Sequence, residues 1–136
     1  MSEETYMNTL EKESIPEGKK EAALPKIIAV DFDGTLVTNQ FPEIGEIRHP
    51  MWDAIKAEQE RGTKLILFTC RTGEFLTQAV DFCREHGLVF DAINDNIDEV
   101  KALGWDARKV SATFYVDDRS AYLSFFGFTT NPLEIL

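Results

Sequence analysis

Three short apolar segments, each followed directly by a polar residue, constrain what this 136-residue chain can fold into. The segments are residues 26–30 (KIIAV), 64–68 (KLILF) and 112–116 (ATFYV). The polar residues that follow them are Asp31, Thr69 and Asp117. The first two runs are typical of strands buried on both faces of a parallel sheet, and the third predicts a further strand. Ligands bind at the carboxyl edge of such sheets, so the polar residues indicate a site there.

Helical patterns fill the intervals between these strands. One helix is predicted between residues 50 and 62 and a second between residues 75 and 87, because apolar residues recur there at helical spacing and a glycine ends each segment. A weaker strand over residues 88–93 and a short helix over residues 97–104 follow. The alternation predicts an α/β, Rossmann-like three-layer sandwich with a mainly parallel central sheet. Residues 124–128 (SFFGF) are a candidate edge strand.

The chain divides into a tail and one domain. Residues 1–25 contain six glutamates and three lysines, with proline and glycine as breakers. We interpret them as an acidic flexible N-terminal tail, with a docking arm or a short helix as the alternative, and whether the tail docks or covers the site stays open. Residues 26–136 have the length of a single domain with one core.

The composition limits the partners and the compartment. The formal net charge of −10 disfavours nonspecific binding to nucleic acid or to an anionic membrane. No apolar run reaches the roughly 20 residues of a membrane span, and the N-terminus lacks the order of a secretory signal. We therefore expect a cytoplasmic protein. Cys70 and Cys83 have no CxxC spacing, and we expect both to be buried and reduced.

The segment Asp31-Phe32-Asp33-Gly34-Thr35-Leu36 places two carboxylates at alternate positions just beyond a strand. A lone aspartate there usually caps a loop, but two spaced aspartates before glycine and threonine fit capping poorly. Phosphoryl transfer gives the pair distinct roles. Asp31 would attack phosphorus, and Asp33 would give a proton to the leaving oxygen and later take one from water.

This chemistry requires a cation, because two carboxylates and a phosphate repel one another. Mg²⁺ prefers oxygen ligands and would reduce this repulsion. We expect it to be held by Asp31, the backbone carbonyl of Asp33, and Asp117, supported by Asp118.

Phosphate binding is assigned to the end of the second strand. Thr69 offers a hydroxyl and backbone donors to a nonbridging oxygen, with Cys70 and Arg71 beside it. A strand or N-cap role for Thr69, and a salt bridge from Arg71 to Glu74 or Asp118, are the structural alternatives.

The transferring phosphoryl group also needs a cation near its oxygens. Lys109, shortly before the last strand, is the candidate. Lys101 competes for this role, and a solvated surface position is the alternative for both lysines.

These motifs resemble those of the haloacid dehalogenase superfamily of phosphohydrolases over about residues 26–119. DFDGTL resembles its first motif, LILFT its second and FYVDD its fourth. The resemblance implies a Rossmann-like (HAD-like) fold, Mg²⁺ and an aspartyl-phosphate intermediate on Asp31. The superfamily also includes dehalogenases, but a halide leaves without a proton, so Asp33 favours hydrolysis of a phosphate monoester.

The spacing leaves no room for the inserted cap that most members of this superfamily have. Residues 34–68 accommodate only a loop and one helix, and residues 94–108 are equally short. We expect an open site with no separate cap domain, which suits a phosphate on a large substrate or closure by a second subunit. Residues 41–49 and 71–74 are expected to contact the leaving group.

Two other functions stay open on the sequence alone. A receiver-like phospho-acceptor also uses a strand-end aspartate, but its adjacent acidic pair comes after the first strand, whereas Asp117 and Asp118 come last. A catalytically idle binding module with the same fold is the second. The phosphorylated substrate itself is left open among sugar phosphates, nucleotides, nucleic-acid ends and proteins. The C-terminal aromatics fit a homo-oligomer interface as well as a core; they are Tyr122, Phe125, Phe126 and Phe128.

Overall fold

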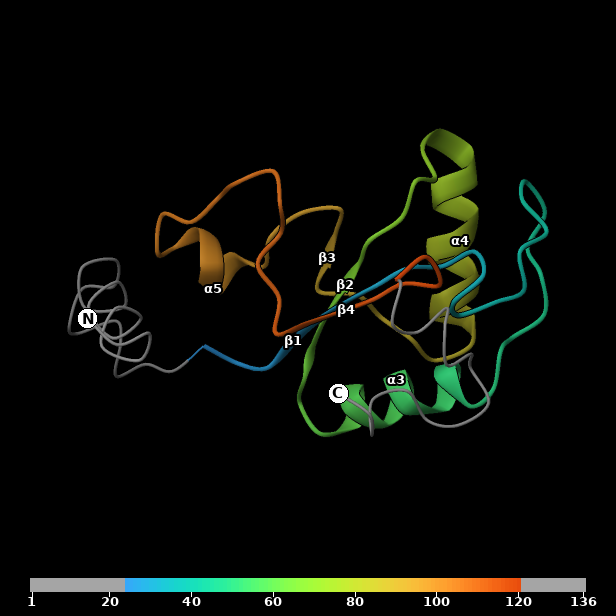
Figure 1. Ribbon diagram of the computed structural model, residues 1–136, viewed down its shortest axis with the longest axis horizontal. Helices are drawn as coiled ribbons and strands as arrows, with labels where there is room; N and C mark the ends of the chain where they lie inside the picture. Colours follow the sequence, from blue (N-terminus) through green and yellow to red (C-terminus); the bar gives the residue numbers. More distant parts are fainter. Residues whose placement is uncertain (1–23, 121–136) are drawn as a thin grey trace.

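A four-stranded parallel sheet forms the centre of the computed structural model, which describes residues 24–120 (Figure 1). The strands are β1 (Ile27–Val30), β2 (Lys64–Leu67), β3 (Ala92–Ile93) and β4 (Phe114–Val116). They lie in the order β3-β2-β1-β4, and every neighbouring pair is parallel. The predicted tail up to residue 23, the candidate edge strand 124–128 and the C-terminal aromatics lie outside the described residues.

Helices connect the strands along the chain. They are α3 (Met51–Glu60), α4 (Gly73–Glu85) and the single-turn α5 (Asp98–Lys101). This alternation confirms the predicted α/β, Rossmann-like fold. No cap domain is evident between residues 24 and 120, where the longest connection, from β1 to α3, contains only isolated bridges. In that same range, the helices are all too short or too polar to cross a bilayer.

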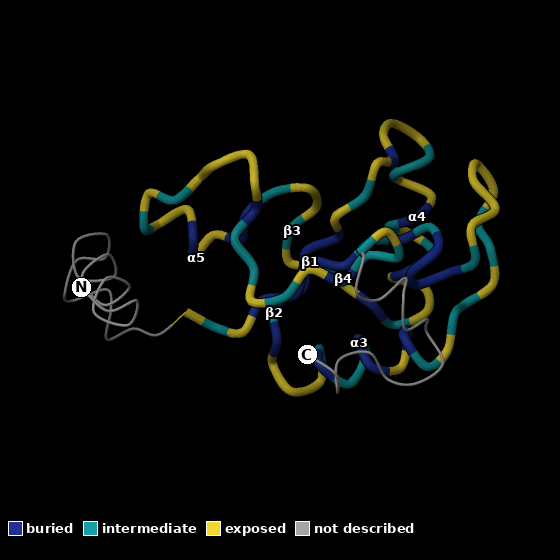
Figure 2. Tube along the Cα trace, in the orientation of Figure 1, coloured by how far each residue is buried: buried dark blue, intermediate teal, exposed yellow. Residues whose placement is uncertain are grey.

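The two faces of the sheet pack against different helices, which explains the continuous apolar run of β1. Ile28 and Val30 belong to a core cluster that includes buried residues of α3 and α4. Ile27 and Ala29 pack on the opposite face in a second cluster with Val100 of α5. All four β1 side chains are therefore buried, as the dark blue centre of the trace shows (Figure 2).

Strand β3 is shorter than the predicted segment 88–93. The Asp91 carboxylate accepts the Leu65 N–H at 2.8 Å, where a backbone carbonyl of a longer strand would pair. The Val89 N–H is donated to Gln59 Oε1 at 3.0 Å instead of to the sheet. These side-chain contacts end the ladder early, so only Ala92 and Ile93 pair with β2.

The strand order creates a topological switch point between β1 and β4. The chain runs outward from β1 to β2 and β3, and then returns to the other side of β1 as β4. In open parallel sheets, the carboxyl ends of strands that flank such a reversal border a crevice that binds ligands. Asp31 follows β1 and Asp117 follows β4, so both lie at this point.

A buried carboxylate at the end of α3 holds the opposite edge of the sheet. Glu58 is 5% exposed and accepts hydrogen bonds from Thr63 Oγ1 at 2.7 Å, Lys26 Nζ at 3.0 Å and Arg61 Nη1 at 3.1 Å. Burial acts to raise the pKa of Glu58, but the Thr63 and Lys26 hydrogen bonds outweigh it and leave the pKa below its ordinary value. Glu58 thereby ties α3 to the residues that open β1 and β2.

We expect Glu58→Gln to lower the free energy of unfolding at pH 7 by about 1–3 kcal/mol, because it weakens three hydrogen bonds to a buried acceptor. The Glu58 pKa is depressed in the folded state, so the carboxylate's stabilisation is fully present above its ordinary value of 4.5 and is lost as the pH falls through the folded-state pKa. Urea unfolding at pH 7 and at pH 3.5 measures both effects. Glu60→Gln on the exposed face of α3 is the control, and equal losses in the two variants would contradict the assignment.

Candidate active site

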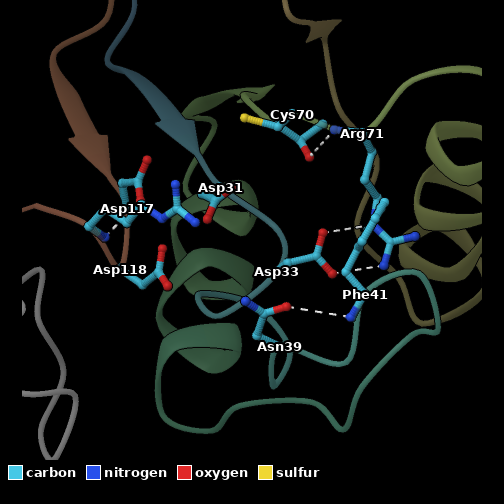
Figure 3. Close-up of a pocket in the computed structure, with 10 residues that line it drawn as sticks. Asp31, Asp33, Asn39, Phe41, Cys70, Arg71, Asp117 and Asp118 are labelled. Carbon is cyan, nitrogen blue, oxygen red and sulfur yellow. Dashed lines mark hydrogen bonds and ion pairs between the residues drawn. The ribbon is translucent and has the colours of Figure 1, made fainter.

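A pocket of about 590 Å³ lies at the carboxyl ends of β1, β2 and β4 (Figure 3). It brings together all but one of the site residues predicted from the sequence, although they come from three distant segments. The residues that line it are Asp31, Asp33, Asn39, Phe41, Thr69, Cys70, Arg71, Asp117, Asp118 and Arg119.

Three carboxylates converge at one end of this pocket. Asp31, Asp117 and Asp118 each place an oxygen within 4.8 Å of the others. The Asp31 N–H donates to Val116 O at 2.9 Å, which joins the ends of β1 and β4. The buried Thr35 hydroxyl donates to Asp31 Oδ2 at 3.3 Å and accepts the Asp118 N–H at 2.9 Å. Backbone and side-chain contacts thus both hold the cluster together.

The electrostatics of this cluster favour a bound cation. Burial, followed by the charges of Asp117 and Asp118, raises the pKa of Asp31 to about 7. Burial and the neighbouring Asp117 also raise the pKa of Asp118. Closely spaced carboxylate oxygens are the hard ligands that Mg²⁺ prefers, and a divalent cation would relieve their repulsion. The donor set therefore fits Mg²⁺.

Gly34 permits the close approach of Asp118 to the first loop. Its φ is +84°, and a Cβ atom at this position would lie 2.3 Å from Asp118 Oδ2. The carbonyl of Gly34 also accepts a hydrogen bond from Arg48 Nη1. The glycine is required both by its backbone conformation and by the space that the Asp118 carboxylate occupies.

Asp33 lies toward the other end of the pocket, turned away from the three carboxylates (Figure 3). Its two oxygens accept hydrogen bonds from Arg71 Nε and Nη2, both at 2.7 Å. This bidentate ion pair is largely withdrawn from solvent, since the Arg71 side chain is 1% exposed and that of Asp33 is 16% exposed. The predicted ion-pair alternatives for Arg71, Glu74 and Asp118, are not the partners that it contacts here.

Arg71 uses all five of its side-chain N–H groups within the protein. Besides Asp33, it donates to the carbonyls of Pro42 at 3.1 Å, Phe75 at 3.2 Å and Glu43 at 2.9 Å. The predicted contact with the substrate is therefore not visible in this arrangement. Arg71 instead fixes the position of Asp33 relative to the loop that carries Pro42 and Glu43.

Thr69 lies in the pocket with its backbone already occupied. Its N–H donates to Asn94 Oδ1 at 2.8 Å, and Asn94 Nδ2 donates to its carbonyl at 2.9 Å. The Thr69 backbone N–H, predicted to contact phosphate, is thus already bonded to Asn94. The Thr69 hydroxyl lies at the pocket wall and accepts the Arg71 backbone N–H at 3.1 Å. Asn94 directly follows β3, and this location at the carboxyl end of a strand is the sequence signal for its role.

Lys109 is placed away from the pocket, contrary to the prediction. Its Nζ lies 5.4 Å from the centroid of the Tyr115 ring, and it lines a separate depression with Trp105. The reason is topological, because Lys109 precedes β4 and so approaches the amino edge of the sheet. Lys101 does not line the pocket either and pairs with Asp95 at 2.6 Å.

The pocket contains residues that the sequence did not single out. Arg119 lines it as well as Arg71, and it directly follows the predicted pair Asp117 and Asp118 in the chain. Asn39 also lines it, from the loop after β1. The two cysteines differ from each other. Cys83 is fully buried, and burial raises its pKa to about 12, whereas Cys70 is exposed at the pocket and corrects the expectation that both are buried.

The fold and the pocket define an α/β protein with an acidic site at the switch point of a parallel sheet. The sequence matches no known family profile and no curated protein. A solved structure of a conserved protein from Bacteroides thetaiotaomicron is similar, with a TM-score of 0.65 and 37% sequence identity. The match covers 73% of this chain and 80% of that one. The chain belongs to the family of that conserved protein.

We expect Gly34→Ala to destabilise the fold more than Gly62→Ala. Both glycines have positive φ, at +84° and +92°, so both substitutions carry a backbone cost of about 1–2 kcal/mol. No atom lies within 4 Å of a Cβ atom added at Gly62, whereas one added at Gly34 meets Asp118. Chemical denaturation of both variants gives the difference, and an equal loss would show that Asp118 does not need this space.

Proposed function

We propose that this protein is a Mg²⁺-dependent phosphatase of the haloacid dehalogenase type, which hydrolyses a phosphate monoester through an aspartyl-phosphate on Asp31. The observation that carries this proposal is the convergence of Asp31, Asp117 and Asp118 within 4.8 Å, in a pocket that also contains Asp33 and Thr69. This arrangement would supply a nucleophile, an acid/base and a cation-binding set at the carboxyl edge of one sheet.

Asp31, Asp117 and Asp118 would hold the ion. When bound, Mg²⁺ supplies the positive charge that lets an anionic phosphate approach anionic carboxylates. The Thr35 hydroxyl holds Asp31 and Asp118 close, because it donates to the Asp31 carboxylate and accepts the Asp118 N–H. Gly34 leaves the space that the Asp118 carboxylate occupies.

In the first step, a carboxylate oxygen of Asp31 forms a bond to phosphorus while the bond from phosphorus to the leaving oxygen breaks. The Thr69 hydroxyl donates to a nonbridging oxygen. Arg119 takes the role for which the sequence suggested Lys109, because the other arginine that lines the pocket, Arg71, is already paired with Asp33.

Asp33 handles the proton in both steps. Protonated Asp33 gives its proton to the leaving oxygen, after one of its hydrogen bonds with Arg71 has loosened. The resulting carboxylate then takes a proton from the water that attacks the aspartyl-phosphate, and phosphate is released with Asp31 restored. The hydrogen bonds from Arg71 fix the orientation of the Asp33 carboxyl group, and each of its oxygens retains a lone pair for the proton.

The experiment that tests this function is a screen of phosphate monoesters with the parent protein and Asp31→Asn. We expect turnover that requires Mg²⁺, is abolished by EDTA, and falls at least about 1000-fold in Asp31→Asn, because the substitution removes the nucleophile. Asp81→Asn, on the exposed face of α4, is the control and should retain parent activity. Unchanged turnover in Asp31→Asn, or no turnover of any ester by the parent, would refute the proposal.

Metal binding is measured separately from activity. We expect Mg²⁺ at 100 times its Kd to stabilise the parent by about 2.7 kcal/mol, because the ion binds only the folded arrangement of carboxylates. Asp118→Asn removes one charge of the set and should need a higher Mg²⁺ concentration for the same increase in Tm. Asp53→Asn, an exposed residue of α3, serves as the control. Identical Mg²⁺ titrations of all three proteins would argue against this site.

A further inference from the structure

The pocket has a second end that the chemistry at Asp31 does not use. Phe41 and Asn39 lie on the side of Asp33, away from Asp117 and Asp118 (Figure 3). We infer that Phe41 is the platform for a flat ring in the leaving group of the substrate. This inference rests on the proposed function and names the class of ester that the site accepts.

The position of Asp33 gives the direction of the leaving group. A residue that protonates the leaving oxygen must lie on the side of the phosphoryl group from which that oxygen departs. Asp33 occupies that side, opposite the carboxylate cluster, and Phe41 and Asn39 line the wall next to it (Figure 3). The leaving group would therefore be placed against Phe41.

Phe41 presents an aromatic surface to this part of the pocket. Phe41 remains 55% exposed, in a wall whose other members are mostly charged or polar. A pocket of about 590 Å³ holds far more than a phosphate group, and ligand pockets of this size bury most of a drug-sized molecule. A flat ring would cover the exposed aromatic surface, which a short aliphatic leaving group would leave in water.

The ring of Phe41 is also held in place, which separates it from a mobile surface side chain. Arg71 Cζ lies 5.1 Å from its centroid, and the Phe75 ring meets it edge-on at 5.6 Å. Asn39 Oδ1 accepts the Phe41 N–H at 3.4 Å. Arg71 therefore contacts both the acid/base Asp33 and the Phe41 ring, and fixes the distance between the two.

The loop that carries Phe41 is closed at its base by the chain itself. The Thr38 N–H donates to Glu46 O at 2.8 Å, and the Glu46 N–H donates to Thr38 Oγ1 at 3.0 Å. A Cβ atom on Gly45 would lie 2.1 Å from Thr38 O, so this closure needs a glycine there. The platform is thus built before any ligand binds, which reduces the entropy cost of stacking.

Matched pairs of esters test the inference. One pair is a nucleoside 5′-monophosphate and ribose 5-phosphate, and the other is phosphotyrosine and phosphoserine. We expect Phe41→Ala to lower kcat/KM about 5- to 50-fold for at least one ring-bearing ester, mainly through KM, because a stacking contact is lost. The ring-free ester of that pair should change less than about twofold. A loss confined to the nucleotide pair indicates that the ring is carried on a sugar, and a loss confined to the phosphotyrosine pair indicates that the ring is bonded directly to the ester oxygen.

Two further variants keep the test independent of folding. Phe41→Trp retains a ring and should retain the preference, whereas Phe41→Leu retains apolar volume and should lose it. Equal effects of Phe41→Ala on both members of each pair, or no effect on any, would overturn the inference. Turnover of ribose 5-phosphate or phosphoserine that depends on Asp31 tests the proposed function separately.

A binding measurement covers the case in which turnover is absent. In the Asp31→Asn background, calorimetry with a nucleoside 5′-monophosphate and with phosphotyrosine should show weaker binding of at least one of them when Phe41 is replaced by alanine. Equal affinity for both compounds with and without the Phe41 ring would overturn the inference, whatever the outcome for hydrolysis.

Discussion

The repulsion among three carboxylates is the constraint on which the rest of the site depends. Asp31, Asp117 and Asp118 are held within 4.8 Å, although burial and mutual charge raise the pKa values of Asp31 and Asp118. Such a cluster persists only where the surrounding fold overcomes the repulsion. Here the parallel pairing of β1 with β4 and the hydrogen bonds of the Thr35 hydroxyl hold the carboxylates together. The stability of the sheet is thus used to maintain a region that favours a cation.

A buried guanidinium organises the opposite end of the pocket. A charge with 1% exposure is costly unless it is paired and its donors are satisfied, and Arg71 meets both conditions. The same contacts determine the geometry, because one planar group fixes Asp33, the carbonyls of the loop and the Phe41 ring together. Asp33 and the pocket wall at Phe41 are therefore held in position by the same side chain.

Local patterns predicted the framework of the site, and long-range contacts determined the rest. The apolar runs before Asp31 and Thr69 indicated strands buried on both faces, and the run before Asp117 indicated a further strand, which forms an edge of the sheet with Tyr115 exposed. Parallel strands bring their carboxyl ends to one edge. Nothing local indicates that Arg71 pairs with Asp33, because their contact spans 38 positions. The Asp91 side chain that ends β3 early is equally hidden, since its acceptor role depends on the placement of Leu65. The position of Lys109 outside the pocket follows from the chain order, because residues that precede a parallel strand approach the amino edge of the sheet.

The absence of a cap among residues 24–120 changes where selectivity must reside under the proposed function. An inserted domain excludes water and contacts the leaving group when it closes, but the chain between β1 and α3 forms only a short closed loop. Water exclusion then has to come from the ligand itself, which must cover the pocket wall that it contacts. A flat ring against Phe41 would cover apolar surface next to Asp33 and strengthen the interactions of that carboxylate by displacing solvent. Under the proposed function the leaving group would then exclude water as a cap domain does, and Arg71 would couple its binding to proton transfer by Asp33.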